Sequence, residues 1–91
     1  MMDPSFVPLD HIVASQLEDG DGVLVDLNTR QYFQLNETAM RIWRAVENGR
    51  PLDQIVEELK ATYEVSDQRA IASAERLLQK LHERKLVRPA D

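Results

Sequence analysis

The stretch that decides the fold is residues 30–46, RQYFQLNETAMRIWRAV, where a strand pattern changes into a helix pattern within a few residues. Its first half, QYFQL, contains aromatic side chains that favour strands. Phe33 and Leu35 fall on one face of this segment, and Tyr32 and Gln34 fall on the other. The segment therefore predicts a β-strand at residues 31–35.

The second half of the stretch predicts a helix. Asn36 is a good N-cap because its side-chain oxygen can accept a backbone N–H that has no partner within the helix. Apolar residues then recur at helical spacing, at Ala39, Ile42, Trp43 and Val46. Gly49 is suited to ending the helix. We expect Phe33 and Trp43 to pack in the core.

Two shorter strands are predicted upstream, at residues 12–16 and in VLVDL at 23–27. The turn EDGDG between them contains Gly20 and Gly22, which can adopt positive φ without steric cost. The residues of VLVDL that we expect on one face are Val23, Val25 and Leu27. A tight turn at residues 28–29 leads into QYFQL. The three strands predict a small antiparallel meander, which needs a helical layer against one face to be stable.

Two further helices are predicted downstream, over residues 50–63 and 67–84, with Ser66 as the N-cap of the last one. The apolar stripe of the last helix comprises Ile71, Ala74, Leu77, Leu78 and Leu81, and we expect Ile71 and Leu78 in the core. The order of elements predicts an α+β, winged helix-turn-helix-like domain, with a three-stranded antiparallel sheet followed by three helices. We expect one domain over residues 1–91, with a core from about residue 10 to about residue 88.

Composition narrows the classes of function. The absence of cysteine excludes a disulfide framework and a thiolate metal site. No apolar run approaches about 18 residues, and the acidic N-terminus, MMDPSFVPLD, does not resemble a signal peptide, so we expect a cytoplasmic protein with no membrane partner. The net charge of −5 disfavours nucleic-acid binding. Residues 66–91 are nevertheless mildly basic and can attract an acidic peptide locally.

No set of residues predicts catalysis. His11 and His82 lie near opposite ends of the chain without other ligands at metal spacing, so we expect both on the surface. A calcium loop starting at Asp19 would place Arg30 where a glutamate ligand is required. A chain with three glycines contains no glycine-rich phosphate loop. We therefore expect a binding protein, not an enzyme, without a cofactor or a metal.

Two features indicate a binding surface. An outer strand of a meander has unpaired backbone groups, and residues 31–35 contain no Lys, Pro or other feature that would protect such an edge, so an extended peptide can add to it. The last helix places polar and basic residues roughly along one side, at Arg69, Ser73, Arg76, Lys80 and Arg84. Each feature also has a simpler interpretation: a loop, the N-terminal segment or a dimer partner covers the edge, and the charges form a solvated face.

The ordered motifs of residues 22–88 resemble the PqqD-like family, the peptide-recognition domains of ribosomally synthesised natural-product pathways. The motifs are Tyr32–Phe33, LNETA at 35–39, Ile42–Trp43, Gly49, Leu77–Leu81 and Leu86–Val87. The resemblance implies that the leader segment of a precursor peptide adds as a strand to the third β-strand and lies against the third helix. The contacts carried over by position are Gln31, Tyr32, Phe33, Gln34 and Leu35 on the strand, and Ala70, Ala74, Leu77 and Leu81 on the helix. Arg76, Lys80 and Arg84 are then available to acidic leader residues.

Within the family, the chain is similar to the stand-alone leader-binding subunit of lasso-peptide pathways, which works with a separate leader peptidase and a macrocyclase. The peptide chaperone of the pyrroloquinoline quinone pathway is the alternative inside the family. Outside it, one alternative is a DNA-binding winged helix that places its third helix in the major groove. The net charge of −5 and the lack of a downstream wing hairpin oppose that alternative. Another is a structural dimer that pairs two QYFQL edges.

Overall fold

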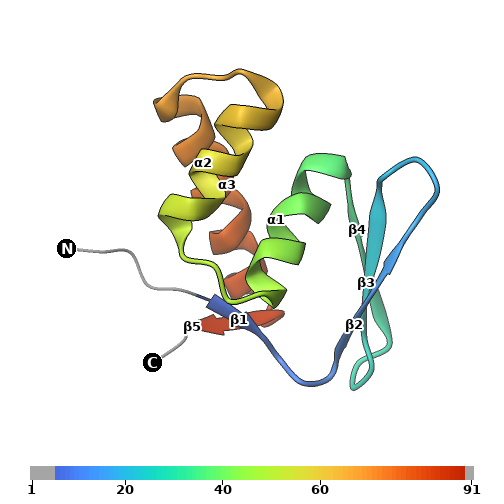
Figure 1. Ribbon diagram of the computed structural model, residues 1–91. Coiled ribbons are helices and arrows are strands. Elements are labelled where there is room, and N and C mark those ends of the chain that lie inside the picture. The colour runs from blue at the N-terminus through green and yellow to red at the C-terminus, as the bar shows by residue number, and fades with distance from the viewer. Residues whose placement is uncertain (1–5, 90–91) are drawn as a thin grey trace.

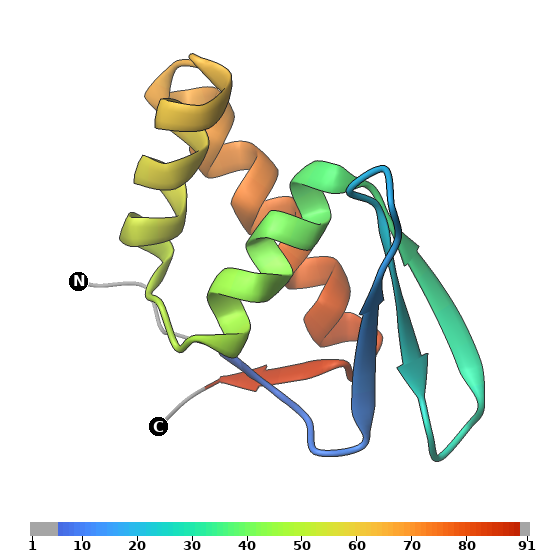
Figure 2. The same cartoon turned by 45° about the vertical axis from the view of Figure 1, so that its right-hand side comes forward.

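The computed structural model describes residues 6–89, which form two antiparallel sheets and three helices (Figure 1). The elements in chain order are β1 (Phe6–Pro8), β2 (Ile12–Gln16), β3 (Gly22–Asp26), β4 (Gln31–Leu35), α1 (Glu37–Glu47), α2 (Leu52–Tyr63), α3 (Asp67–Glu83) and β5 (Val87–Pro89). One sheet has the order β2-β3-β4, and β1 pairs with β5 in the other. All three helices lie on the same side of the three-stranded sheet, with α1 next to it, and no helix of the described chain covers its outer face (Figure 2).

The predicted succession of three strands and three helices is confirmed for β2–β4 and α1–α3. The second sheet was not predicted, because β1 and β5 have only three residues each and show no periodicity. Their pairing joins Phe6 to Pro89 and Pro8 to Val87, and Leu9 N donates a hydrogen bond to Leu86 O at 3.1 Å. It therefore fastens both ends of the described chain to each other beneath the helices. The winged-helix comparison stays a prediction.

The prediction that Val23 and Val25 share one face of β3 is confirmed, but this face is the outer one and not the face against the helices. Leu24 and Asp26 are buried on the inner face, whereas Val23 and Val25 lie on the other face and are only partly covered. Leu27 follows the end of the strand and is 57% exposed. Four of the five residues of VLVDL are apolar, so alternation alone does not decide which face is buried. The packing of α1 decides it.

Gly22 serves a purpose other than the predicted one. Gly20 has the expected φ of +95°, but Gly22 is a buried strand residue outside the positive-φ region. A Cβ atom at position 22 would overlap the Sδ atom of Met40, a fully buried residue of α1. The missing side chain of Gly22 thus allows α1 to approach the sheet closely.

The helices enclose a single core with Trp43 at its centre. Trp43 is fully buried, as expected, and its Nε1 donates to Glu47 Oε2 at 2.9 Å, so the indole N–H is satisfied. On α3 the buried residues are Ala70, Ala74, Leu78 and Leu81. The prediction for Leu78 is confirmed. The prediction for Ile71 is wrong, because the buried stripe begins one residue earlier, at Ala70, and leaves Ile71 39% exposed.

We expect Gly22→Ala to destabilise the protein by about 1–3 kcal/mol, because an added methyl group must displace a buried side chain. Urea denaturation at neutral pH measures the change. Ser15→Ala, an exposed substitution on β2, is the control and should leave stability nearly unchanged.

A double-mutant cycle tests the cause. If the clash is with Met40, Gly22→Ala and Met40→Ala together should cost less than the sum of the two single losses. Strictly additive losses would contradict this explanation.

Candidate functional site: a groove between β4 and α3

β4 is an edge of the three-stranded sheet, and its outward-facing backbone groups belong to Tyr32 and Gln34. Leu27 N donates to His11 O at 2.9 Å, which shows that odd-numbered residues near the end of β3 bond to β2. Neighbouring residues of a central antiparallel strand bond to opposite sides, so the even-numbered residues of β3 bond to β4. Their partners are Gln31, Phe33 and Leu35. The N–H and C=O groups of Tyr32 and Gln34 therefore point away from the sheet.

The turn that leads into β4 is held by Asp26. Its Oδ1 accepts hydrogen bonds from Asn28 N at 2.9 Å and Thr29 N at 3.1 Å, and Arg30 completes the turn with a φ of +63°. Burial acts to raise the pKa of Asp26. The two backbone donors and the nearby His11, whose Nε2 lies 3.7 Å from Oδ1, outweigh burial and hold the pKa below its usual 3.8. His11 is partly buried in this contact, and not fully on the surface as predicted.

Asn36 fixes the other end of β4. It follows Leu35 directly and caps α1, with its Oδ1 accepting a hydrogen bond from Ala39 N at 2.8 Å. The strand edge and the helix start are thus joined by a single residue. Any ligand running along β4 therefore meets the first turn of α1 as soon as it leaves the strand.

Three adjoining pockets follow α3 from β4 to the α2–α3 turn, and we call them together the α3 groove. The first, of about 310 Å³, is lined by Tyr32, Phe33, Gln34, Leu35, Leu77, Lys80, Leu81, Arg84 and Leu86. The second, of about 340 Å³, is lined by Asn36, Thr38, Ala39, Ile42, Ser73, Arg76, Leu77 and Lys80. The third, of about 290 Å³, is lined by Thr38, Leu59, Tyr63, Val65, Arg69, Ala70 and Ser73. Adjoining pockets share residues, so the groove is continuous.

Most of the residues predicted to form the site line this groove. Tyr32, Phe33, Gln34, Leu35, Ala70, Arg76, Leu77, Lys80, Leu81 and Arg84 all do so. Gln31 and Ala74 line none of the three pockets, and Ala74 is fully buried. The contact of any of these residues with a leader peptide stays a prediction.

The sequence analysis missed the wall that α1 and the end of α2 contribute. Thr38 and Ile42 of α1 and Tyr63 of α2 line the groove. The signals in the sequence were the LNETA motif for Thr38 and the Ile42–Trp43 motif for Ile42, whereas Tyr63 belongs to no motif. Only the way the helices pack brings them beside α3.

Where the groove adjoins β4, it contains the cationic side chain of Arg84. The guanidinium carbon of Arg84 lies 5.6 Å from the ring centroid of Phe33, within cation–π range. Phe33 is half-buried and packs against the core. The stacking holds a positive charge beside the open strand edge.

Within residues 6–89, no group of three or more His, Cys, Asp or Glu side chains could hold a metal ion. None of the helices in this part of the chain is long and apolar enough to cross a membrane. The α3 groove combines an open strand edge with apolar walls and cationic side chains.

Comparison with known proteins identifies the family. Residues 21–87 match the model of the family described as coenzyme PQQ synthesis protein D (PqqD). The chain belongs to the PqqD family. A search of curated protein sequences found no match.

Two solved structures share the PqqD-family fold seen here. One, described as TbiB1 in complex with the TbiA(beta) leader peptide, is 27% identical with a TM-score of 0.85, and the match covers 93% of this chain and 98% of that one. The other is described as lasso peptide synthetase B1 complexed with the leader peptide. It is 28% identical with a TM-score of 0.84, and the match covers 93% of this chain and 99% of that one.

The shifted pKa of Asp26 gives a pH-dependent prediction. A carboxylate whose pKa is lowered by folding stabilises the native state above its unfolded pKa, and this contribution is lost as the pH falls through the folded value. We therefore expect Asp26→Asn to be less stable than the parent protein at pH 7, with a smaller difference at pH 3. Urea denaturation at both pH values measures it.

Asp10→Asn, the same charge change on an exposed residue of the preceding loop, is the control and should differ little from the parent protein at either pH. A stability loss in Asp26→Asn that is equal at pH 7 and pH 3 would show that the carboxylate charge is not what holds the turn.

Proposed function

We propose that the protein binds the leader segment of a ribosomally synthesised precursor peptide and presents it to the processing enzymes of a lasso-peptide-type pathway. The observation that carries the proposal is the outer edge of β4, which pairs with no further strand of residues 6–89 and opens directly on the α3 groove. Both solved relatives are described as leader-peptide complexes, which supports the same class of ligand here. The proposed role is recognition without catalysis.

Strand addition explains how such a peptide would be held. The backbone of the leader pairs with the outward groups of Tyr32 and Gln34, which gives affinity independent of sequence. Every second leader side chain then enters the groove and contacts apolar residues such as Leu77 and Leu81. The remaining side chains point to the same side as the Tyr32 ring.

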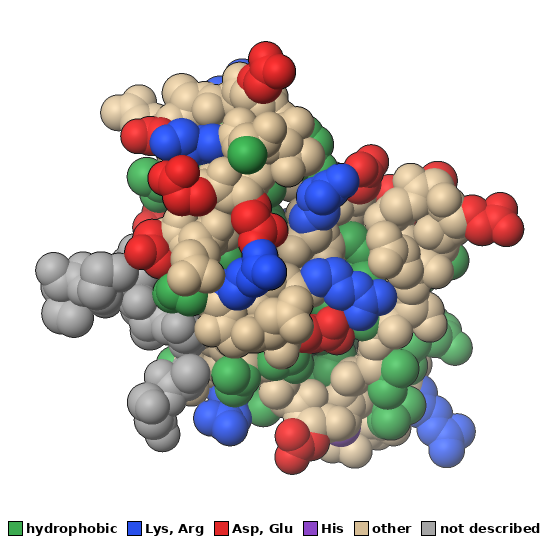
Figure 3. Space-filling view, viewed as in Figure 1, with side chains coloured by type: hydrophobic (Ala, Val, Ile, Leu, Met, Phe, Trp, Pro, Cys, Tyr) green, Lys and Arg blue, Asp and Glu red, His purple; other side chains and the backbone are tan. Residues whose placement is uncertain are grey.

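The outer face of the sheet supports the second half of the proposal, the delivery to an enzyme such as a leader peptidase or a macrocyclase. Val13, Val25 and Tyr32 lie directly opposite one another across the three strands and form an apolar row. Val13 is 46% exposed and Tyr32 is 75% exposed. Figure 3 shows hydrophobic side chains over the lower part of the sheet. A leader strand on β4 would extend this row, so an enzyme docked there would contact protein and peptide together.

Pairing at the edge is tested with Tyr32→Pro. Proline removes an outward N–H without removing a bond between β3 and β4, so we expect the fold to persist and leader affinity to fall about tenfold. Fluorescence anisotropy, with a labelled leader of the precursor encoded beside the gene, measures the affinity.

Ala14→Pro, on the opposite edge strand β2, is the matched control and should bind the leader normally. Unchanged leader affinity in a folded Tyr32→Pro variant would rule out strand addition at β4. No binding of the leader to the parent protein would rule out the proposed function itself. A shift in mass to a dimer that the leader does not alter would favour pairing between two β4 edges.

Delivery to an enzyme is tested with Val13→Asp, which places a charge in the apolar row but leaves β4 intact. We expect unchanged leader affinity and slower leader removal by the pathway's leader peptidase in a reconstituted reaction. Gln54→Asp, on the exposed side of α2, is the control and should have no effect on either measurement. Normal cleavage with Val13→Asp would exclude the outer face as the docking surface.

A further inference from the structure

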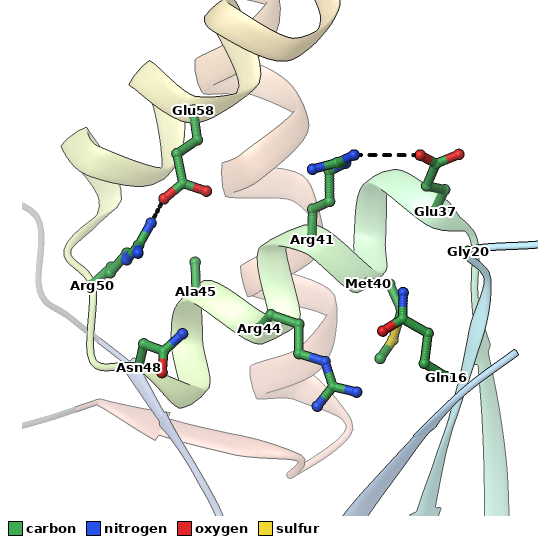
Figure 4. Close-up of a pocket in the computed structure, with 10 residues that line it drawn as sticks. All are labelled: Gln16, Gly20, Glu37, Met40, Arg41, Arg44, Ala45, Asn48, Arg50 and Glu58. Atoms are coloured by element: carbon green, nitrogen blue, oxygen red, sulfur yellow. Dashed lines mark ion pairs between the residues drawn. The ribbon is translucent and has the colours of Figure 1, made fainter. Parts of the chain in front are cut away.

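Eight of the eleven Lys and Arg residues form two groups that differ in their partners. The other three, Arg30, Lys85 and Arg88, belong to neither group and form no ion pair within residues 6–89. On the side of α1 and α2, each cation is paired with a carboxylate. Arg41 lies 3.6 Å from Glu37 and Arg44 lies 2.9 Å from Glu47, and the further pairs are Arg50–Glu58 and Lys60–Asp67. Figure 4 shows two of these pairs around the pocket over α1, and Figure 3 shows acidic and basic side chains interleaved across this face.

The cations of the α3 groove have no such partners. Arg69, Arg76, Lys80 and Arg84 all line the groove, and none forms an ion pair with a carboxylate of residues 6–89. No Asp or Glu of the described part of the chain is among the residues that line its three pockets. The chain as a whole contains 16 acidic residues against 11 Lys and Arg. In so acidic a protein, a groove with four cations and no carboxylate is complementary to an anionic ligand.

We propose that the α3 groove selects leader peptides with carboxylates at alternate positions of the docked segment, opposite Arg76, Lys80 and Arg84. The inference rests on the proposed function and specifies its ligand. These three cations recur every four residues along α3, a rise of about 6 Å per step. Two residues of an extended strand span about 6.6 Å. One step along the helix therefore matches one step between leader side chains that face the groove.

The three cations are placed in order along the path of the ligand. Arg84 lies over Phe33 of β4, Lys80 lines the first and the second pocket, and Arg76 lines the second, next to Asn36 and Thr38. A strand paired with β4 passes them in that order or its reverse. Apolar groove residues such as Leu77 lie between the cations, so the same leader face combines acidic and apolar side chains.

The geometry favours a peptide over a nucleic acid as the anion. The cations stand beside an open strand edge whose N–H and C=O groups are matched along their length by the backbone of an extended peptide, and a nucleic-acid backbone has no equivalent series of donors and acceptors. A duplex would also have to approach a protein with a net charge of −5. Duplex DNA is therefore included as a competitor in the test.

The experiment uses two isomeric peptides, which are variants of the leader sequence of the precursor encoded beside the gene. Native acids in the docked segment are first replaced by their amides. Two glutamates are then placed two positions apart in one peptide and three positions apart in the other. The peptides have the same composition and net charge, but only in the first do both carboxylates face the groove. Anisotropy titrations at low and at high salt measure both affinities.

We expect the first isomer to bind about fivefold more tightly at low salt, and this advantage to shrink at about 1 M salt because the contacts are exposed. The double variant Lys80→Glu/Arg84→Glu should lose or reverse the preference. Arg44→Glu/Arg50→Glu, the same charge change on two residues that line the pocket over α1 and none of the groove pockets, should keep it.

The other outcomes overturn the inference in distinguishable ways. Equal, saturable binding of both isomers would leave leader recognition standing and reject selection by carboxylate spacing. Failure of the folded protein to bind either isomer and the native leader would reject the proposed function as well. Displacement of the native leader by duplex DNA, with a steep salt dependence, would assign the cations to phosphate groups instead.

Discussion

The close packing of Met40 of α1 over Gly22 of β3 is the constraint on which the rest of the structure depends. A three-stranded sheet is not stable without a layer on one face, and α1 supplies that layer only because position 22 has no side chain. Leu24 is fully buried beside it. Once α1 is placed on β3, Asn36 fixes where β4 stops, and the edge of β4 stays open along the side of α3.

An open strand edge is a hazard for a protein of this size, because it can pair with any other strand. β4 contains no Lys, Pro or β-bulge within its five residues. The short length of the strand, the adjoining groove and the cations of α3 limit which chains can pair with it. Under the proposed function, the same features that restrict unwanted pairing would select a specific ligand, and an unprotected edge would then be consistent with binding.

Local signals in the sequence were sufficient to predict the three helices. The side chains of Asn36 and Ser66 cap α1 and α3 by accepting hydrogen bonds from Ala39 N and Arg69 N, and Asn and Ser are preferred residues at this position. Periodicity was not sufficient to predict which face is buried where most positions are apolar, as in VLVDL. It also misplaced the buried stripe of α3, which begins at a small residue, Ala70. The β1–β5 pairing joins residues from opposite ends of the chain, and nothing local predicts it.

The strand and the last helix that line the α3 groove could be predicted from the sequence, but the electrostatics of the groove could not. The spacing of Arg76, Lys80 and Arg84 is visible in the sequence, where a solvated helix face explains it equally well. Only the packing shows that acidic residues accompany the cations of α1 and α2 and are absent from the walls of the α3 groove.

The cations of the α3 groove would compensate for the low sequence selectivity of strand addition. Backbone pairing supplies affinity but is nearly blind to sequence, and a strand that slips by two residues keeps the same side chains in the groove. Exposed ion pairs contribute little affinity, since each is worth about 0.2–1 kcal/mol. A short series of carboxylates set against a short series of cations nevertheless has one position of best overlap. The backbone would then supply most of the affinity, while the charges of α3 and its apolar pockets choose the register in which the leader is held.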